Sequence, residues 1–443
     1  MNILPLNNLS PFYTVPVKAQ KMNNQQKNYN NCHTNLCCTY PVTNISFHAN
    51  LSKIPTKLER FEGCILGGAI GDAMGYPLEL LKTQEIYKRF GNSGLHYPLK
   101  INSKYYFSDD TQMSLFTIKG LLKSLEYNNN LNEEPIYKVI YDAYQDWYKT
   151  QTTEAPMLKG SDIFNRVELY SRRGPGTTCL SSLKSKKMGT IDLPTNNSPT
   201  NGAVMKVAPV GLIYSSSPEL SFKIGMNIGV MTHGNEGAYL PAGFLSSFIA
   251  YLQQGKTLEE SLDASIKILK GMQKHEHFLS LIEKAKKLAN SDTPTTEAIE
   301  QIGAGFRGDE ALAISLYSAL KNPKSFKRAI TTSINHSGDS DTTGAITGNI
   351  MGSLLGSSSI NRSWKDNIEL NDLLYKCSSD LLKAKESCEN YQNMLLRRKG
   401  DIFTGKIKKM QYTEEDHIKM KSMTNEQKEQ YIWDLKQKLN KKA

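Results

Sequence analysis

Hydrophobic residues recur at intervals of three and four along the middle of the chain, which is the spacing of α-helices with one buried face. Met113, Phe116 and Leu121 form one such series, and Leu312, Leu316 and Leu320 form another. Runs of alternating β-branched residues, which would indicate strands, are scarce. The pattern therefore predicts an all-α, multi-helix body over residues 58–396.

One stretch of this body lacks the helical spacing. Residues 171–202 are dense in Gly, Pro, Ser, Thr and Asn, which are residues of turns and loops. We predict a long irregular loop there, of the kind that is often functional inside compact domains. For Arg172 and Arg173, near its start, surface charge and substrate contact are equally good interpretations.

The two ends differ from the body in composition. Residues 1–57 contain 11 Asn, five Lys and no acid, which predicts a disordered basic leader. Residues 397–443 contain 13 Lys and Arg against seven acids. Ile432, Leu435 and Leu439 there predict a short amphipathic helix in a charged C-terminal segment. The sequence thus predicts three parts, 1–57, 58–396 and 397–443.

Composition narrows the class of protein. Of 443 residues, 39% are hydrophobic, so a sizeable core can form, and no apolar run is long enough to span a membrane. The net charge of +11 comes from the two ends, because residues 58–396 hold 36 charges of each sign. This argues against nucleic-acid binding by the body, whereas an acidic partner remains open for the tails. Seven scattered Cys and no Sec-type signal predict a cytoplasmic protein, with delivery elsewhere by the leader left open. We also expect it to be a monomer.

Glycines recur every fourth residue in two segments. One series is Gly67, Gly71 and Gly75, and the other runs from Gly344 to Gly356. Glycine destabilises a helix interior, so this spacing indicates that two backbones approach closely. The flanking residues are too polar for a membrane pair, and we predict two tightly packed helices within the body.

Two acidic clusters precede helical patterns. The first contains Ser108, Asp109 and Asp110, and the second contains Asp339, Asp341 and Thr342. Helix capping favours such residues, but one acid is enough for a cap. Four carboxylates brought together would repel each other unless cations lay between them, and all-oxygen ligands favour Mg²⁺, Mn²⁺ or Ca²⁺. An EF-hand is excluded because Ile350 stands where that loop needs a glutamate.

At this level of detail the chain resembles the ADP-ribosylglycohydrolases, the family of dinitrogenase reductase-activating glycohydrolase and the ADP-ribosyl-acceptor hydrolases. The matching segments occur in the family's order within residues 61–357. They are residues 63–79, 108–115, 172–183, 201–212, 232–243, 308–320 and 335–352. No single segment is specific for the family, but seven segments in the family's order are.

The resemblance implies an orthogonal all-α fold with a binuclear Mg²⁺ centre, or Mn²⁺, at the base of a cleft. By position it assigns metal binding to Ser108, Asp109, Asp110, Asp339, Asp341 and Thr342. It assigns the acid that faces the metals to Glu79, the loop around the ADP-ribose diphosphate to Asn201 and Gly202, and a ligand-proximal histidine to His233. One departure concerns the loop, where Lys206 stands in place of the family's arginine and one glycine is missing.

The chemistry that the resemblance implies is hydrolysis of the bond between ribose C1 and an acceptor atom. Glu79 is the expected general base or acid, and Asp110 is the second candidate. Arginine-linked ADP-ribose on protein is the preferred substrate. Serine-linked or small-molecule ADP-ribose is an alternative, and so is a non-catalytic protein that binds ADP-ribose or blocks a partner on the same fold.

Overall fold

We describe a computed structural model of the chain, in which residues 54–128, 133–153, 162–403 and 431 are described. The leader predicted for residues 1–57 therefore lies almost wholly outside the described residues, as does the amphipathic helix predicted around residues 432–439. The last described helix begins at Asn371 and continues to Phe403.

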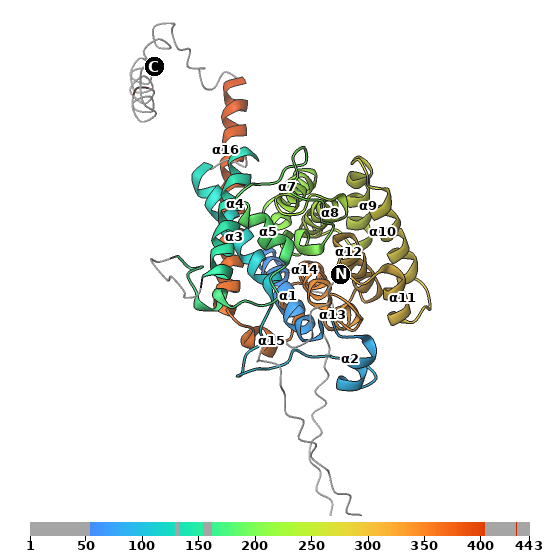
Figure 1. The fold of residues 1–443 in the computed structure, drawn as a ribbon. Coiled ribbons are helices and arrows are strands. Elements are labelled where there is room, and N and C mark those ends of the chain that lie inside the picture. The colour runs from blue at the N-terminus through green and yellow to red at the C-terminus, as the bar shows by residue number, and fades with distance from the viewer. Residues whose placement is uncertain (1–53, 129–132, 154–161, 404–430, 432–443) are drawn as a thin grey trace, which may run out of the picture. The chain divides into compact units, whose positions relative to one another are not determined.

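Within the described ranges, helices account for all of the regular structure apart from isolated β-bridges (Figure 1). The α-helices are α1 Lys57–Gly75, α2 Thr83–Phe90, α3 Asp109–Asn128, α4 Glu133–Thr152, α5 Thr177–Lys184, α6 Ala208–Ile213, α7 Pro218–Val230, α8 Glu236–Gln253, α9 Leu258–Lys270, α10 Glu276–Ala289, α11 Thr295–Ile302, α12 Gly308–Lys321, α13 Phe326–Ile334, α14 Ser340–Leu355, α15 Arg362–Asn367 and α16 Asn371–Phe403. Four short 3₁₀ turns lie at Tyr76–Leu78, Val167–Tyr170, Asn201–Ala203 and Ser357–Ser359. The predicted all-α class is confirmed.

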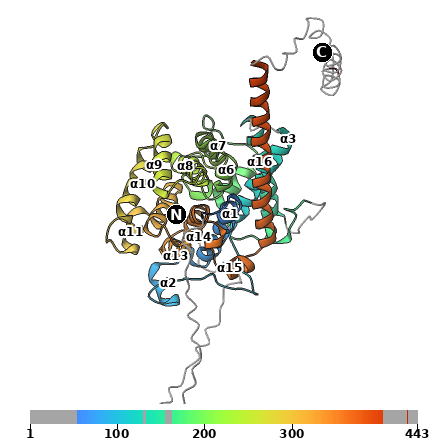
Figure 2. The same cartoon turned by 180° about the vertical axis from the view of Figure 1, so that it is seen from behind.

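Helices α1 and α14 form the central pair of the body and lie side by side in both views (Figures 1 and 2). They are antiparallel, and their glycines face each other. A Cβ atom placed on Gly67 would stand 2.4 Å from the carbonyl oxygen of Gly348, and one on Gly71 would stand 2.0 Å from that of Gly344. The tight helix pair predicted from the glycine spacing is therefore confirmed, and only glycine permits this distance between the axes.

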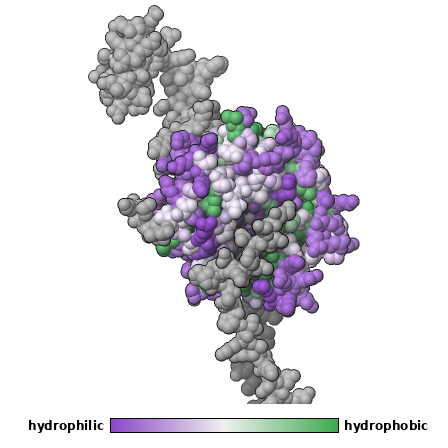
Figure 3. Space-filling view, in the orientation of Figure 1, coloured by the Kyte–Doolittle hydropathy of each residue, from purple (hydrophilic) through white to green (hydrophobic). Residues whose placement is uncertain are grey.

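The remaining helices surround this pair and bury one continuous hydrophobic core that includes Phe61, Phe116, Trp147 and Phe244. Helix α3 packs on α4 and α16, while α8 packs on α7 and α12. No helix of the described part combines the length and apolarity needed to cross a membrane. Figure 3 shows one face, where hydrophilic residues predominate and hydrophobic residues form small separate groups.

The prediction of a long irregular loop over residues 171–202 is wrong in one respect. Helix α5, Thr177–Lys184, lies inside it. The segment is rich in Ser and Thr, and its propensity alone is weak, but Cys179 and Leu183 are fully buried by neighbouring helices. Tertiary burial therefore stabilises a helix that the local composition does not indicate.

Candidate active site

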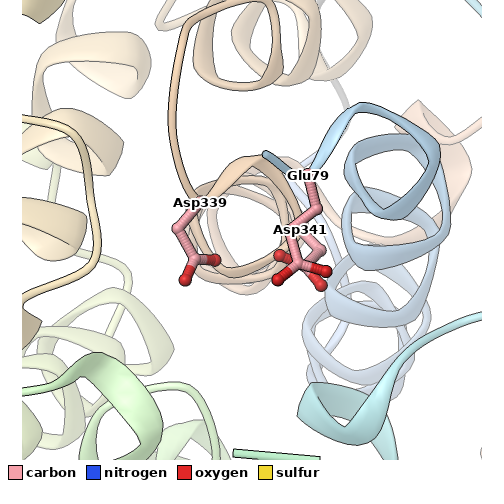
Figure 4. Close-up of side chains that lie close together, drawn as sticks. All are labelled: Glu79, Asp339 and Asp341. Atoms are coloured by element: carbon pink, nitrogen blue, oxygen red, sulfur yellow. The ribbon is translucent and has the colours of Figure 1, made fainter. Parts of the chain in front are cut away.

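The first turn of α14 carries two carboxylates toward one point. Asp339 is the N-cap residue and its side chain accepts a hydrogen bond from the backbone N–H of Thr342, while Asp341 lies in the first turn. Glu79 follows the 3₁₀ turn at the end of α1. Carboxylate oxygens of Glu79, Asp339 and Asp341 lie within 4.8 Å of one another and are directed to the same side (Figure 4).

The backbone around Glu79 is tied to the segment before Asp339. The N–H of Leu80 donates to the carbonyl oxygen of Gly338 at 3.1 Å. Leu80 has φ +65°, a left-handed conformation that costs a non-glycine residue about 1 kcal/mol or more. This turn redirects the chain immediately after Glu79 and holds its side chain beside the start of α14.

The first acidic cluster, Ser108 to Asp110, lies at the start of α3 and is held by a residue for which the sequence offers no separate signal. Asp72 on α1 is fully buried. Its carboxylate accepts from the N–H of Ser108 at 2.9 Å and from the N–H of Thr111 at 3.0 Å, and also from the Thr111 hydroxyl. Asp72 thus acts as a cap in trans for α3, and fixes the segment that carries Asp109 and Asp110.

The loop before α5 wraps around Asp109. The N–H of Gly176 donates to the Asp109 carboxylate at 3.1 Å, and the N–H of Asp109 donates to the carbonyl oxygen of Arg173 at 3.1 Å. The Arg173 guanidinium is partly buried in a two-pronged ion pair with Glu369 and also donates to the carbonyl of Phe107. Arg173 therefore anchors the loop and is not a free surface charge, while Arg172 is exposed.

These segments enclose a pocket of about 180 Å³. The sequence-predicted residues that line it are Glu79, Asp109, Asp110, Asn201, Gly202, His233, Asp339, Asp341 and Thr342. Ser108 is fully buried and is not among the lining residues; its hydroxyl accepts from the N–H of Asp110. Asn201 donates to the Asp339 carboxylate at 2.8 Å and to the carbonyl of Gly305, so its amide nitrogen is already engaged.

Without a cation, the ionised carboxylates of the pocket repel one another, and this repulsion raises their pKa values. Burial and the charges of Asp339 and Asp72 raise the pKa of Glu79 to about 8. Burial and neighbouring carboxylates also raise the pKa values of Asp109, Asp110 and Asp341 well above their ordinary range. Asp110 Oδ2 is buried without a hydrogen-bond partner. Clustered acids, an all-oxygen donor set and an unsatisfied buried carboxylate oxygen fit a hard divalent cation.

An aromatic ring stands at the same pocket. Phe306 follows the Gly303–Gly305 turn and remains 40% exposed although it lines the pocket. Exposed phenyl rings of this kind offer a flat surface on which a planar base can stack. The sequence offers no signal for Phe306, because a single phenylalanine in a glycine-rich turn has no specific spacing.

Comparison with known proteins places these features in a family. The sequence profile of the ADP-ribosylglycohydrolases matches residues 53–390. The uncharacterised protein YegU of Escherichia coli K12 is 27% identical over 335 residues, covering 71% of this chain and 92% of YegU. ADP-ribosylarginine hydrolase Tri1 of Serratia proteamaculans is 22% identical, covering 70% of this chain and 75% of Tri1.

Human ADP-ribosylhydrolase ARH3 is 22% identical, covering 70% of this chain and 90% of ARH3. Among solved structures, a chain of an ADP-ribosylglycohydrolase-related protein complex superposes with a TM-score of 0.54 at 20% identity, covering 74% of this chain and 99% of that one. At this identity the superposition shows the fold. Because the family profile spans most of its length, the chain belongs to the ADP-ribosylglycohydrolase family.

Proposed function

We propose that this protein is a divalent-metal-dependent hydrolase that removes ADP-ribose from an ADP-ribosylated acceptor, with arginine-linked ADP-ribose on protein as its substrate. The observation that carries the proposal is the meeting of two distant acidic clusters, 108–110 and 339–342, and Glu79 around one pocket. A protein that only binds ADP-ribose has no need of so many buried acids, because their mutual repulsion destabilises the fold.

The residues suited to hold the cations are those of the two clusters, with Asp109 and Asp110 on one side and Asp339 and Asp341 on the other. Bound divalent ions supply charge that neutralises these carboxylates, and they orient ligand oxygens and lower the pKa of water. We propose that two ions bind there, Mg²⁺ or Mn²⁺. Glu79 lies close enough to the second cluster to serve as a ligand as well as a base.

We assign the proton transfer to Glu79. Hydrolysis forms a bond between water oxygen and ribose C1 and breaks the bond from C1 to the acceptor nitrogen. A carboxylate accepts the proton of the attacking water and returns a proton to the leaving guanidine. Burial and nearby negative charge raise the pKa of Glu79 to about 8 in the pocket without cations, and bound divalent ions would lower it toward neutral pH, where a carboxyl group can both accept and donate a proton.

The opposite wall of the pocket suits the ADP part of the ligand. Gly202, in the 3₁₀ turn Asn201–Ala203, presents bare backbone to the pocket, and Phe306 offers its ring for the base. The arginine linkage is favoured by the Ser-Asp-Asp-Thr-Gln-Met form of residues 108–113. It is also favoured by the likeness to a relative named as an ADP-ribosylarginine hydrolase.

The experiment compares release of ADP-ribose from arginine-modified and serine-modified protein, each with Mg²⁺ and with EDTA. We expect metal-dependent release from the arginine-modified substrate and its loss in Asp341→Asn. Release from the serine-modified substrate alone would overturn the proposed specificity for arginine-linked ADP-ribose. Release from neither, with ADP-ribose binding retained in calorimetry, would overturn the hydrolase in favour of a binding protein.

A further inference from the structure

A buried lysine lies behind the ligand wall of the pocket. The side chain of Lys206 is fully inaccessible to solvent. Its Nζ donates to Thr232 Oγ1 at 2.8 Å and stands 4.9 Å from the centroid of the Tyr144 ring. Among the described residues no ion pair includes Lys206. Burying an ammonium group without a carboxylate partner is expensive, so the position calls for a reason beyond packing.

A thiolate does not supply that reason. Of the ionisable groups that line the pocket, Cys179 and Asp109 interact electrostatically with Lys206, and Asp109 is too far away to form an ion pair with it. Burial raises the pKa of the Cys179 thiol to about 11, so the group is a neutral thiol near pH 7. Lys206 therefore acts through the hydrogen bond that it makes, not through a charge pair with sulfur.

The hydrogen bond fixes the direction of the next one. An ammonium group can only donate, so Thr232 Oγ1 must accept from Lys206. The Thr232 hydroxyl then has one proton left to donate, and His233 Nδ1 lies 2.8 Å from the same oxygen. If Nδ1 carried the proton instead, the threonine hydroxyl would face only the ammonium and the weakly accepting thiol of Cys179. The chain of donors thus runs from Lys206 through Thr232 to His233.

The other ring nitrogen of His233 faces the ligand loop. A Cβ atom placed on Gly202 would stand 3.1 Å from His233 Nε2 and 2.9 Å from its Cε1, so this edge of the ring lies against Gly202. His233 and Gly202 both line the pocket. When Nδ1 accepts from Thr232, a neutral imidazole carries its single proton on Nε2, at the edge that faces the pocket.

We propose that Lys206 is a positioning residue that, through Thr232, holds His233 as the neutral Nε2–H tautomer, so that the pocket keeps a fixed donor for a phosphate or ribose oxygen of the ligand. Burial and the charge of Lys206 hold the pKa of His233 well below its usual range, in agreement with a neutral ring. The identity of the ligand rests on the proposed function, but the tautomer does not.

The test reads the tautomer directly in the ligand-free full chain labelled with ¹⁵N-histidine. Long-range ¹H–¹⁵N correlation distinguishes protonated from unprotonated ring nitrogens, and the His233 signals are assigned by their loss in His233→Gln. We expect protonated Nε2 and unprotonated Nδ1 in the wild type. We expect the same in Lys206→Arg, which keeps a donor, and a mixture of tautomers in Lys206→Met. A protonated Nδ1 in the wild type would overturn the proposal.

A matched pair at position 232 tests the relay without changing the lysine. Thr232→Val removes the hydroxyl at nearly constant shape and should give a mixture of His233 tautomers. Thr232→Ser keeps the hydroxyl and should keep the Nε2–H tautomer. ADP-ribose affinity measured by calorimetry should fall about tenfold in Lys206→Met and Thr232→Val, the loss typical of one hydrogen bond to a charged group. Mg²⁺ affinity should not fall in either variant, because neither change removes a proposed cation ligand.

These readings separate the inference from the proposed function. Folded variants with an unchanged tautomer would overturn the relay even if the protein hydrolyses ADP-ribosyl bonds. Failure of the wild type to bind ADP-ribose would overturn the proposed function and the ligand role of His233, whereas the Nε2–H tautomer would still support the relay. Circular dichroism establishes which variants are folded, and either the lysine pair or the threonine pair suffices for the test.

Discussion

The contact between α1 and α14 supports a quantitative prediction for Gly348→Ala. An alanine Cβ at position 348 would stand 1.9 Å from the carbonyl oxygen of Gly67, whereas ordinary contact begins at 3.4 Å. The two helices would have to separate locally by about 1.5 Å, the difference between these distances. Both atoms belong to or are fixed by backbone, so no change of side-chain rotamer relieves the clash.

The magnitude follows from two opposing effects. Overpacking a well-packed core costs about 1–3 kcal/mol, and a clash with backbone belongs at or above the upper end of this range. Replacing glycine by alanine inside a helix returns about 1 kcal/mol. We expect a net loss of about 2 kcal/mol or more in the free energy of unfolding. Asp341 lies seven residues away on the same helix, so displacement of α14 should also weaken Mg²⁺ binding at least tenfold.

Urea unfolding in EDTA measures the stability of the variant, and calorimetry with Mg²⁺ measures the metal site. The matched control is Gly271→Ala at the end of α9, where φ is −80° and the nearest atom to an added Cβ is 3.3 Å away. We expect the control to stay within about 0.5 kcal/mol of the wild type. If Gly348→Ala unfolds at the same urea concentration as the control, the reasoning about the helix contact is refuted.

Three further predictions concern the pocket. Glu79→Gln should lower kcat at least about 100-fold while ADP-ribose affinity in calorimetry stays within a few-fold; an active variant would contradict its role in proton transfer. Asp72→Asn should weaken Mg²⁺ binding about tenfold at unchanged helical content in circular dichroism, because it disrupts the cap that holds Asp109 and Asp110, and wild-type affinity would argue against it. In EDTA, the pKa of Glu79 is about 8 in the folded state, against an ordinary value of 4.5. Because the folded state then binds the proton more tightly than the unfolded state, the contribution of Glu79 to the free energy of unfolding is greatest below pH 4.5 and falls as the pH rises toward 8. Excess Mg²⁺ should remove that loss, and urea titrations that show no effect of Mg²⁺ at pH 8 would speak against the metal site.

The sequence was most informative where chemistry and spacing coincide. Glycines every fourth residue predict the α1–α14 pair because only close backbones require them, and the paired acids at helix starts indicate the two halves of the pocket. The trans cap by Asp72 could not be predicted, since its partners lie 36 and 39 residues away on another helix. The same holds for Arg173, whose partner Glu369 is 196 residues distant. Such contacts depend on the tertiary arrangement, which local patterns do not encode.

The pairing of α1 with α14 has a consequence for how the chain folds during its synthesis on the ribosome. Helix α1 ends at Gly75, and its glycine face has no partner until α14, which begins at Ser340, has been synthesised. At about 5–20 residues per second, this interval lasts roughly 15–50 s. During it the nascent chain holds the first acidic cluster without the second. The pocket therefore cannot form until α14 has been synthesised, and until then the glycine face of α1 lacks the backbone that covers it in the folded protein.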